Sequence, residues 1–303
     1  MNRKILYFIN PVSGPKRTRL SPELLIQKTL EQNIFFEILF TTADGGYPFL
    51  ADKIKNEGFT DVVVCGGDGT VNQIATSLLG IDINIGIVPI GSGNGLALAA
   101  KIPRNIDKAL KIIFTGSATF IDGFFINEKF SCMLCGIGFD AQVAHDFAQQ
   151  PKRGLATYVK QSVKNFIKAA PYNFDITNDG KTFSTDAFFI SIANSNQFGN
   201  NFTIAPKASL QDGLLDIIVA KKMSKARMVW AVLKQTRSGE VGTHEENPDS
   251  YRDHKKEVLY FQTDKLIIHN HQLAPLHIDG DPAQTSKKFT IEILPKAFKL
   301  IMP

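Results

Sequence analysis

The chain has 303 residues, of which 44% are hydrophobic, and a formal net charge of +5. It is long enough for one large domain or two ordinary ones. The modest charge comes without a long basic run, so nucleic acid is not an expected partner. No apolar run approaches the roughly 18 residues of a transmembrane helix, so we expect no transmembrane segment. The three cysteines form no disulfide framework and favour a reducing, cytoplasmic location.

The first part of the chain alternates between strand and helix patterns. Apolar, β-rich runs predict strands at residues 4–9, 35–40, 61–65 and 84–89. Helical apolar spacing lies between and after them, at residues 21–32, 49–56, 71–79 and 96–100. This alternation predicts a doubly wound, mostly parallel sheet, and hence an α/β nucleotide-binding domain over residues 1–121.

From about residue 120 onward, most of the apolar segments are strand-like. We expect strands at residues 120–126, 130–137, 174–177, 185–193, 213–220, 265–269 and 289–294. Helical patterns occupy 155–169 and 225–237, and a charged loop is expected at 239–256. Successive strands with turn signals predict a mainly antiparallel β-sandwich as a second domain over residues 122–291. Residues 292–303 are expected to return to the first domain.

The strongest local signal is the glycine-rich turn GGDGT, from Gly66 to Thr70, between a buried strand and a helix. Glycines let the backbone approach a ligand closely, and the helix N-terminus supplies free N–H groups for phosphate oxygens. Asp68, among these donors, is expected to steer Mg²⁺ or to accept a proton.

Three further segments follow predicted strands: residues 10–14, 41–42 and 91–95. In an open parallel sheet, ligands bind at the carboxyl ends of the strands, so we expect all four turns to line one crevice. The alternative is four ordinary turns.

No GxxxxGK[ST] motif is present, which excludes a P-loop enzyme. The segment GIGFDA, from Gly136 to Ala141, imitates a dinucleotide fingerprint but lies outside the alternating region.

The segments NPVSG, GGDGTVNQIA and PIGSGNGLA together resemble the diacylglycerol kinase catalytic-domain superfamily, which includes bacterial lipid kinases and the sphingosine and ceramide kinases. The resemblance continues through KASLQDGLLDIIVA and the late IDGD segment, in the same order. It implies an N-terminal domain like that of NAD kinase and phosphofructokinase, followed by the β-sandwich. It also implies an ATP- and Mg²⁺-dependent kinase that phosphorylates a lipid hydroxyl, on diacylglycerol, a sphingoid base or a related lipid.

The same resemblance assigns the binding residues. ATP is expected to contact Asn10, Pro11, Val12, Ser13, Gly14, Thr41, Gly66, Gly67, Asp68, Gly69, Thr70, Val71, Asn72, Gly91 and Ser92. The family's structural Mg²⁺ site corresponds to the Asp212 carboxylate and the backbone oxygens of Ser209 and Leu214, and oxygen ligands suit this ion. From local sequence alone, a simple Asp-Gly turn between strands is the favoured interpretation of Asp212.

For the catalytic base, the resemblance favours Asp281 with Asp279 in support, although many bacterial members have Glu at the position of Asp281. On a strand, the two acids would face the same side. In sphingosine-kinase-like members, the aspartate that corresponds to Asp68 has been given this role. A turn with two solvated acids is the further alternative for Asp279 and Asp281. His269, His271 and His277 are expected to be ordinary surface or packed histidines.

Two other functions stay open at this point. One is an NAD-kinase-like enzyme that phosphorylates a soluble nucleotide, because GGDGT alone also fits that class. The other is a catalytically silent protein that binds lipid or nucleotide. For a lipid kinase, the expected partner is a lipid substrate met by peripheral contact with a membrane surface. A homodimer is the usual default among soluble oligomers.

Overall fold

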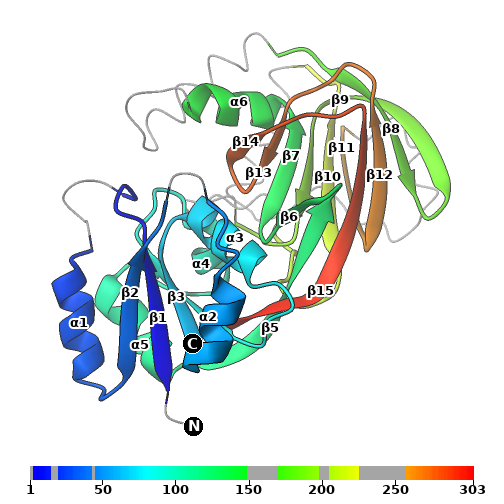
Figure 1. The fold of residues 1–303 in the computed structure, drawn as a ribbon. Coiled ribbons are helices and arrows are strands. Elements are labelled where there is room, and N and C mark those ends of the chain that lie inside the picture. The colour runs from blue at the N-terminus through cyan, green and yellow to red at the C-terminus, as the bar shows by residue number, and fades with distance from the viewer. Residues whose placement is uncertain (1–2, 15–19, 43–44, 149–168, 198–204, 225–256) are drawn as a thin grey trace. The chain divides into compact units, whose positions relative to one another are not determined.

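The computed structural model describes residues 3–14, 20–42, 45–148, 169–197, 205–224 and 257–303 (Figure 1). The chain divides into two compact units. Unit 1 comprises Met1–Asp122 with Pro295–Pro303, and unit 2 comprises Gly123–Leu294. The domain boundaries expected from the sequence were residues 121 and 291.

Unit 1 contains a parallel sheet in the order β4-β3-β1-β2. Its strands are β1 (Lys4–Ile9), β2 (Phe35–Phe40), β3 (Asp61–Gly66) and β4 (Asn84–Pro89). The end of β15 (Lys288–Met302) also pairs with β4 in parallel, through Lys299 and Leu300. β3 is buried along its whole length, as a central parallel strand should be.

Helices cover both faces of this sheet, which makes the domain doubly wound as predicted (Figure 1). They are α1 (Pro22–Leu30), α2 (Leu50–Glu57), α3 (Asp68–Ser77), α4 (Gly95–Ala99) and α5 (Ile106–Thr115). The Ser21 hydroxyl caps α1 by accepting from Leu24 N, and Asn105 caps α5 by accepting from Lys108 N. Helix α5 was not predicted from the sequence, although Asn105 marks its start. In the described part of the chain, no helix is long and apolar enough to cross a membrane.

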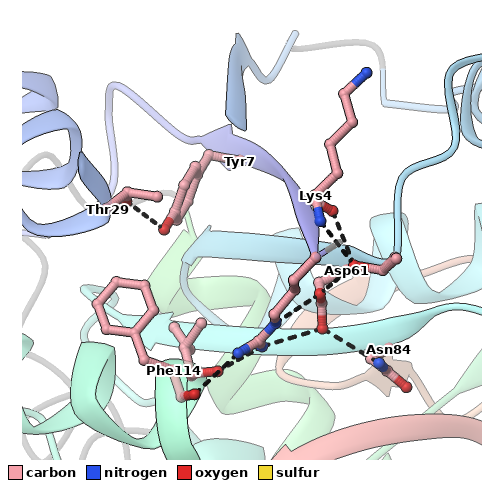
Figure 2. A network of polar contacts seen from close by, with 9 residues as sticks. Lys4, Tyr7, Thr29, Asp61, Asn84 and Phe114 are labelled. Atoms are coloured by element: carbon pink, nitrogen blue, oxygen red, sulfur yellow. Dashed lines mark hydrogen bonds and ion pairs between the residues drawn. The ribbon is translucent and has the colours of Figure 1, made fainter. Parts of the chain in front are cut away.

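An ion pair between Arg3 and Asp61 lies at the amino ends of β1 and β3 (Figure 2). The Arg3 guanidinium lies 2.8 Å from Asp61 Oδ2 and also donates to the carbonyl oxygens of Ile113 and Phe114 at the end of α5. Asp61 is only 1% exposed and accepts a further hydrogen bond from Asn84 Nδ2. This network links β1, β3, β4 and α5, so the polar residues at the amino edge of the sheet stabilise the fold.

Unit 2 is built on antiparallel strands, as the sequence predicted. Its strands include β6 (Lys129–Ser131), β7 (Leu134–Gly138), β8 (Tyr172–Asn178), β9 (Lys181–Ala193), β10 (Leu215–Lys221), β11 (Val258–Thr263), β12 (Lys265–Asn270), β13 (Leu276–Ile278) and β14 (Asp281–Ala283). They run in the order β14-β13-β7-β9-β8-β12-β15, with β10 paired to β9 and β11. β5 (Ser117–Ile126) pairs with β6, and large buried side chains such as Phe124, Phe174 and Phe289 fill the core.

The structure differs from the sequence prediction at several places in unit 2, among them the strands β11, β13 and β14, which were not predicted. The strand expected at 130–137 is divided into β6 and β7, because the chain bends at Cys132 and Met133. The unpredicted helix α6 (Phe139–Ala148) begins directly after β7 and packs on β7, β13 and β14. The helices expected at 155–169 and 225–237 and the loop expected at 239–256 lie outside the described residues, apart from Ala169.

Candidate active site

The four predicted nucleotide-binding segments all follow the carboxyl ends of neighbouring parallel strands in unit 1. Asn10 follows β1, Thr41 follows β2, Gly67 follows β3, and Gly91 lies just after β4. Hydrogen bonds join the segments. Asn10 N donates to Cys65 O at 2.9 Å, and Asn10 Nδ2 donates to Thr70 Oγ1 at 2.8 Å. The structure therefore brings residues from separate motifs together at one edge of the sheet, as the parallel topology requires.

The turn after β3 and the turn after β4 meet backbone to backbone. The carbonyl of Gly66 accepts from Ile90 N at 3.1 Å and from Gly91 N at 3.3 Å. A Cβ atom on Gly67 would lie 3.2 Å from the Cα of Gly91, and a Cβ on Gly91 would overlap the Cα of Gly67. Only glycine fits this approach at Gly91, because a side chain there would separate the two turns.

Asp68 is the first residue of α3, and its carboxylate bridges two helices. Its Oδ1 accepts from Leu96 N, in the first turn of α4, at 3.3 Å. A negative charge at a helix N-terminus is stabilised by the helix dipole and the free N–H groups. Asp68 therefore holds the two turns in place, besides any role in the reaction.

The remaining predicted ATP-binding residues differ in their exposure. Pro11 and Ser92 are exposed and Val12 is 77% exposed, while Ser13 and Gly14 are half-buried in the same turn as Asn10. Gly69 and Asn72 are half-buried on α3. Thr70 and Val71 are buried in its first turn, so Val71 can offer a ligand little beyond its backbone.

Asn94 is a candidate site residue that sequence analysis did not single out. Its Nδ2 donates to Gly91 O at 2.7 Å, which fixes the turn after β4. Its Oδ1 is buried and has no hydrogen-bond partner among the described residues. A buried acceptor left unsatisfied is costly, and a donor from a ligand or a water molecule would satisfy it. The signal in the sequence was an asparagine within a glycine-rich turn directly before α4. Asparagine tolerates a positive φ better than most residues, and Asn94 adopts φ of 56°.

In unit 2, Asp279 and Asp281 differ in burial and in hydrogen bonding. The Asp279 carboxylate is 6% exposed and accepts from Ser131 Oγ and from three backbone N–H groups. Those N–H groups belong to Cys132, Met133 and Leu134, at the bend between β6 and β7. Asp281, the first residue of β14, is exposed.

The two acids therefore do not face the same side of one strand, as the sequence analysis expected. Asp279, with φ of 49°, and Gly280, with φ of 87°, form the turn between β13 and β14. The turn directs one carboxylate into the protein and leaves the other at the surface. Asp279 anchors the bend at Cys132 and Met133, and Asp281 is exposed at the surface.

Two of the three cysteines lie in this region. Cys132 and Cys135 are both buried and free. Burial raises the pKa of the Cys135 thiol well above its usual value, and the negative charges of Asp279 and Asp140 raise it further. Cys135 therefore stays protonated at neutral pH, and it packs in the hydrophobic core of unit 2.

The predicted metal ligands lie in one turn before β10. Asp212 Oδ1 accepts from Leu214 N at 3.1 Å, and Ser209 Oγ accepts from Gln211 N at 3.3 Å. Burial, with a smaller contribution from the charge of Asp212, raises the pKa of nearby Asp216 to about 7, although a hydrogen bond from Gln262 lowers it. The Asp212 carboxylate and the backbone oxygens of its turn are ligands of the kind that a hard divalent cation takes. The described residues contain no cluster of three acidic, His or Cys side chains, so a cation here would also need backbone oxygens.

The fold and the glycine-lined edge define a two-domain protein of the kinase type. Residues 4–125 match the model of the "Diacylglycerol kinase catalytic domain". Residues 134–302 match that of the "YegS C-terminal NAD kinase beta sandwich-like domain". The chain therefore belongs to the diacylglycerol kinase catalytic-domain superfamily, a family of lipid kinases.

Similar proteins agree with this assignment over nearly the whole chain. Proteins from Salmonella typhimurium (strain LT2) and Salmonella newport, both named "Probable lipid kinase YegS", are 26% identical over 281 residues, which cover 90% of this chain and 88% of theirs. The crystal structure of a diacylglycerol kinase from Bacillus anthracis str. Sterne superposes with a TM-score of 0.73. That match covers 99% of this chain and 97% of the other, at 19% identity, and shows that the fold is the same.

Proposed function

We propose that this protein transfers the γ-phosphate of ATP to a hydroxyl group of a lipid, in the presence of Mg²⁺. The observation that carries the proposal is the carboxyl edge of the sheet in unit 1. The four turns predicted to bind the nucleotide follow neighbouring strands at this edge, and Gly67 and Gly91 approach each other backbone to backbone. The names of the similar proteins support a lipid as the acceptor. In this proposal, the enzyme binds its lipid acceptor at a membrane surface.

The nucleotide is bound by main-chain groups in this proposal. The ten-residue helix α3 presents its N-terminal N–H groups next to Gly67, where phosphate oxygens are stabilised. Asn10 and Thr70, already joined by a hydrogen bond, fix the turn after β1 against α3. Because Gly91 has no side chain, a second turn can approach the same phosphates.

Unit 2 supplies the acceptor chemistry. The exposed Asp281 carboxylate takes the proton of the lipid hydroxyl as that oxygen bonds to the γ-phosphorus. The bond from the γ-phosphorus to the bridging oxygen breaks, and ADP leaves with the electron pair. Mg²⁺, when bound, neutralises charge on the phosphate oxygens. Asp68 is the carboxylate suited to hold it at the nucleotide, and the Asp212 turn would hold a structural ion.

The substitution Asp68→Asn tests this proposal. The amide oxygen of the substituted side chain can still accept from Leu96 N, so the two turns stay together while the charge is lost. We expect ATP consumption in the presence of dispersed lipid to fall by about a hundredfold or more, which is ~2.7 kcal/mol of transition-state stabilisation. The matched control is Asp82→Asn, because the Asp82 side chain is 85% exposed in the same unit.

The wild-type protein and both variants are compared by coupled ATP-consumption kinetics and calorimetric ATP titration. Full activity in the folded Asp68→Asn variant would contradict the proposed role of this edge. ATP binding without any turnover in the wild-type protein would instead indicate a silent binder.

A further inference from the structure

Unit 2 contains a buried acid and a buried histidine that the proposed reaction does not use directly. His277, on β13, is fully buried, and Asp140, in the first turn of α6, is 8% exposed. His277 Nε2 lies 3.4 Å from Asp140 Oδ2. Burying an imidazole and a carboxylate costs free energy unless they hydrogen-bond well, and the 3.4 Å contact between these two atoms is not a hydrogen bond, so the pair is an expensive feature of the core.

The glycine between the two side chains is required by their approach. β13 pairs with β7 so that His277 lies opposite Gly136. A Cβ atom on Gly136 would overlap Asp140 Oδ2 and come within 2.5 Å of His277 Nε2. The dinucleotide-like GIGFDA segment is thus explained by packing, because its first glycine makes room for the pair that includes its own aspartate.

The second ring nitrogen of His277 contacts the turn that precedes Asp281. Gly280 N donates to His277 Nδ1 at 3.3 Å. Because Nδ1 accepts, a neutral ring has its proton on Nε2, the nitrogen that faces Asp140. The imidazole therefore connects the Asp140 carboxylate on α6 with the backbone of the β13–β14 turn.

The same turn is held from a second direction by Asp279. Its carboxylate accepts from the backbone N–H groups at the bend between β6 and β7, and its own N–H donates to Leu134 O at 2.8 Å. A further contact, from His145 Nε2 to Leu276 O at 2.8 Å, ties α6 to β13. The two residues before Asp281 are thus fixed on both sides by buried polar groups.

We propose that Asp140 and His277 are positioning residues that set the backbone, and hence the carboxylate, of Asp281 for phosphate transfer. Asp140 orients the ring and His277 holds Gly280, and neither side chain needs to touch the substrate. This inference rests on the proposed function, since it presupposes that the Asp281 carboxylate acts on the lipid hydroxyl. General-base geometry is sensitive to small displacements, and a misplacement of about 1 Å can cost roughly a hundredfold in rate.

Two substitutions at His277 separate the two halves of its contact. In His277→Asn the amide oxygen can occupy the place of Nδ1 and keep the bond to Gly280, while the contact with Asp140 is lost. In His277→Gln the amide can reach towards Asp140, and the acceptor for Gly280 is lost. We expect kcat for lipid phosphorylation to fall roughly 10- to 100-fold in His277→Gln and less in His277→Asn. Asp140→Asn should lower kcat by about tenfold.

In all three variants we expect the KM for ATP to stay unchanged, because the nucleotide edge belongs to unit 1. The matched control is His271→Asn, which removes an exposed histidine paired with Asp175 at 2.7 Å in the same unit and should leave kcat unchanged. Thermal unfolding and circular dichroism determine the folded fraction of each variant. Wild-type kcat in folded His277→Gln and Asp140→Asn, or a loss of kcat that only follows the folded fraction, would overturn the inference.

Asp281→Asn, measured in the same series, distinguishes this inference from the proposed function. If Asp281→Asn is inactive while the His277 and Asp140 variants keep full kcat, the positioning role is wrong and the base assignment stands. If Asp281→Asn is fully active, the base assignment is wrong and the positioning role falls with it. The inference is supported if Asp281→Asn shows the largest loss, His277→Gln a smaller one and His271→Asn none.

Discussion

The backbone contact between Gly67 and Gly91 leads to a quantitative prediction for Gly91→Ala. The added Cβ would overlap the Cα of Gly67, and a backbone atom cannot rotate aside as the end of a side chain can. Overpacking of this kind costs about 1–3 kcal/mol, and relief requires the two turns to move apart. Since those turns are the proposed phosphate site, we expect ATP affinity to fall at least about tenfold, or ~1.4 kcal/mol.

Gly86→Ala is the matched control, because Gly86 lies within β4, away from the edge. Its Cβ would lie 3.1 Å from Ile113 Cγ1 and 3.2 Å from Val63 Cγ2, both of which are side-chain atoms. It should lower the thermal midpoint by a few degrees and leave ATP affinity unchanged. Calorimetric titration with ATP and thermal unfolding are measured on both variants. Wild-type ATP affinity in Gly91→Ala would refute the reasoning, as would an equal loss of affinity in both variants.

Two further predictions concern stability. Without ATP, Mg²⁺ at a hundredfold excess over its Kd should stabilise the wild-type protein by about 2.7 kcal/mol, which is measured as a rise in the thermal midpoint. Asp212→Asn should abolish this rise. An equal rise in both proteins would disprove the assigned site. Arg3→Met should destabilise the protein by about 3 kcal/mol, because it leaves the buried Asp61 carboxylate without its ion partner. ATP affinity should not change in Arg3→Met, and calorimetry combined with urea unfolding checks both points.

Much of unit 1 could be predicted from local sequence. Three of its strands, β1, β2 and β4, have the predicted bounds, because continuous apolar runs closed by turn residues leave little choice of position. α3 begins at Asp68 rather than Val71, since the glycine turn itself enters the helix. The missed helix α5 has a capping asparagine and buried residues at helical spacing, so its signal was present in the sequence.

Unit 2 shows what local pattern cannot predict. Nothing within SCMLCGIGF indicates that the strand bends at Cys132, because the bend is held by Asp279, which is far away in the sequence. For the same reason, period-two alternation wrongly placed Asp279 and Asp281 on one strand face. The Asp140–His277 pair also depends on the register between β13 and β7. Such contacts follow from tertiary structure, and no single segment contains them.

The most direct test of the account is the transfer of radiolabelled phosphate from ATP to a panel of detergent-dispersed lipids in the presence of Mg²⁺. The panel includes diacylglycerol, a sphingoid base and ceramide, with NAD⁺ as a parallel soluble acceptor. We predict that the label enters an organic-phase lipid, which would also identify the acceptor. Label in NADP⁺ but in none of the lipids would contradict the central claim and favour an NAD-kinase-like enzyme.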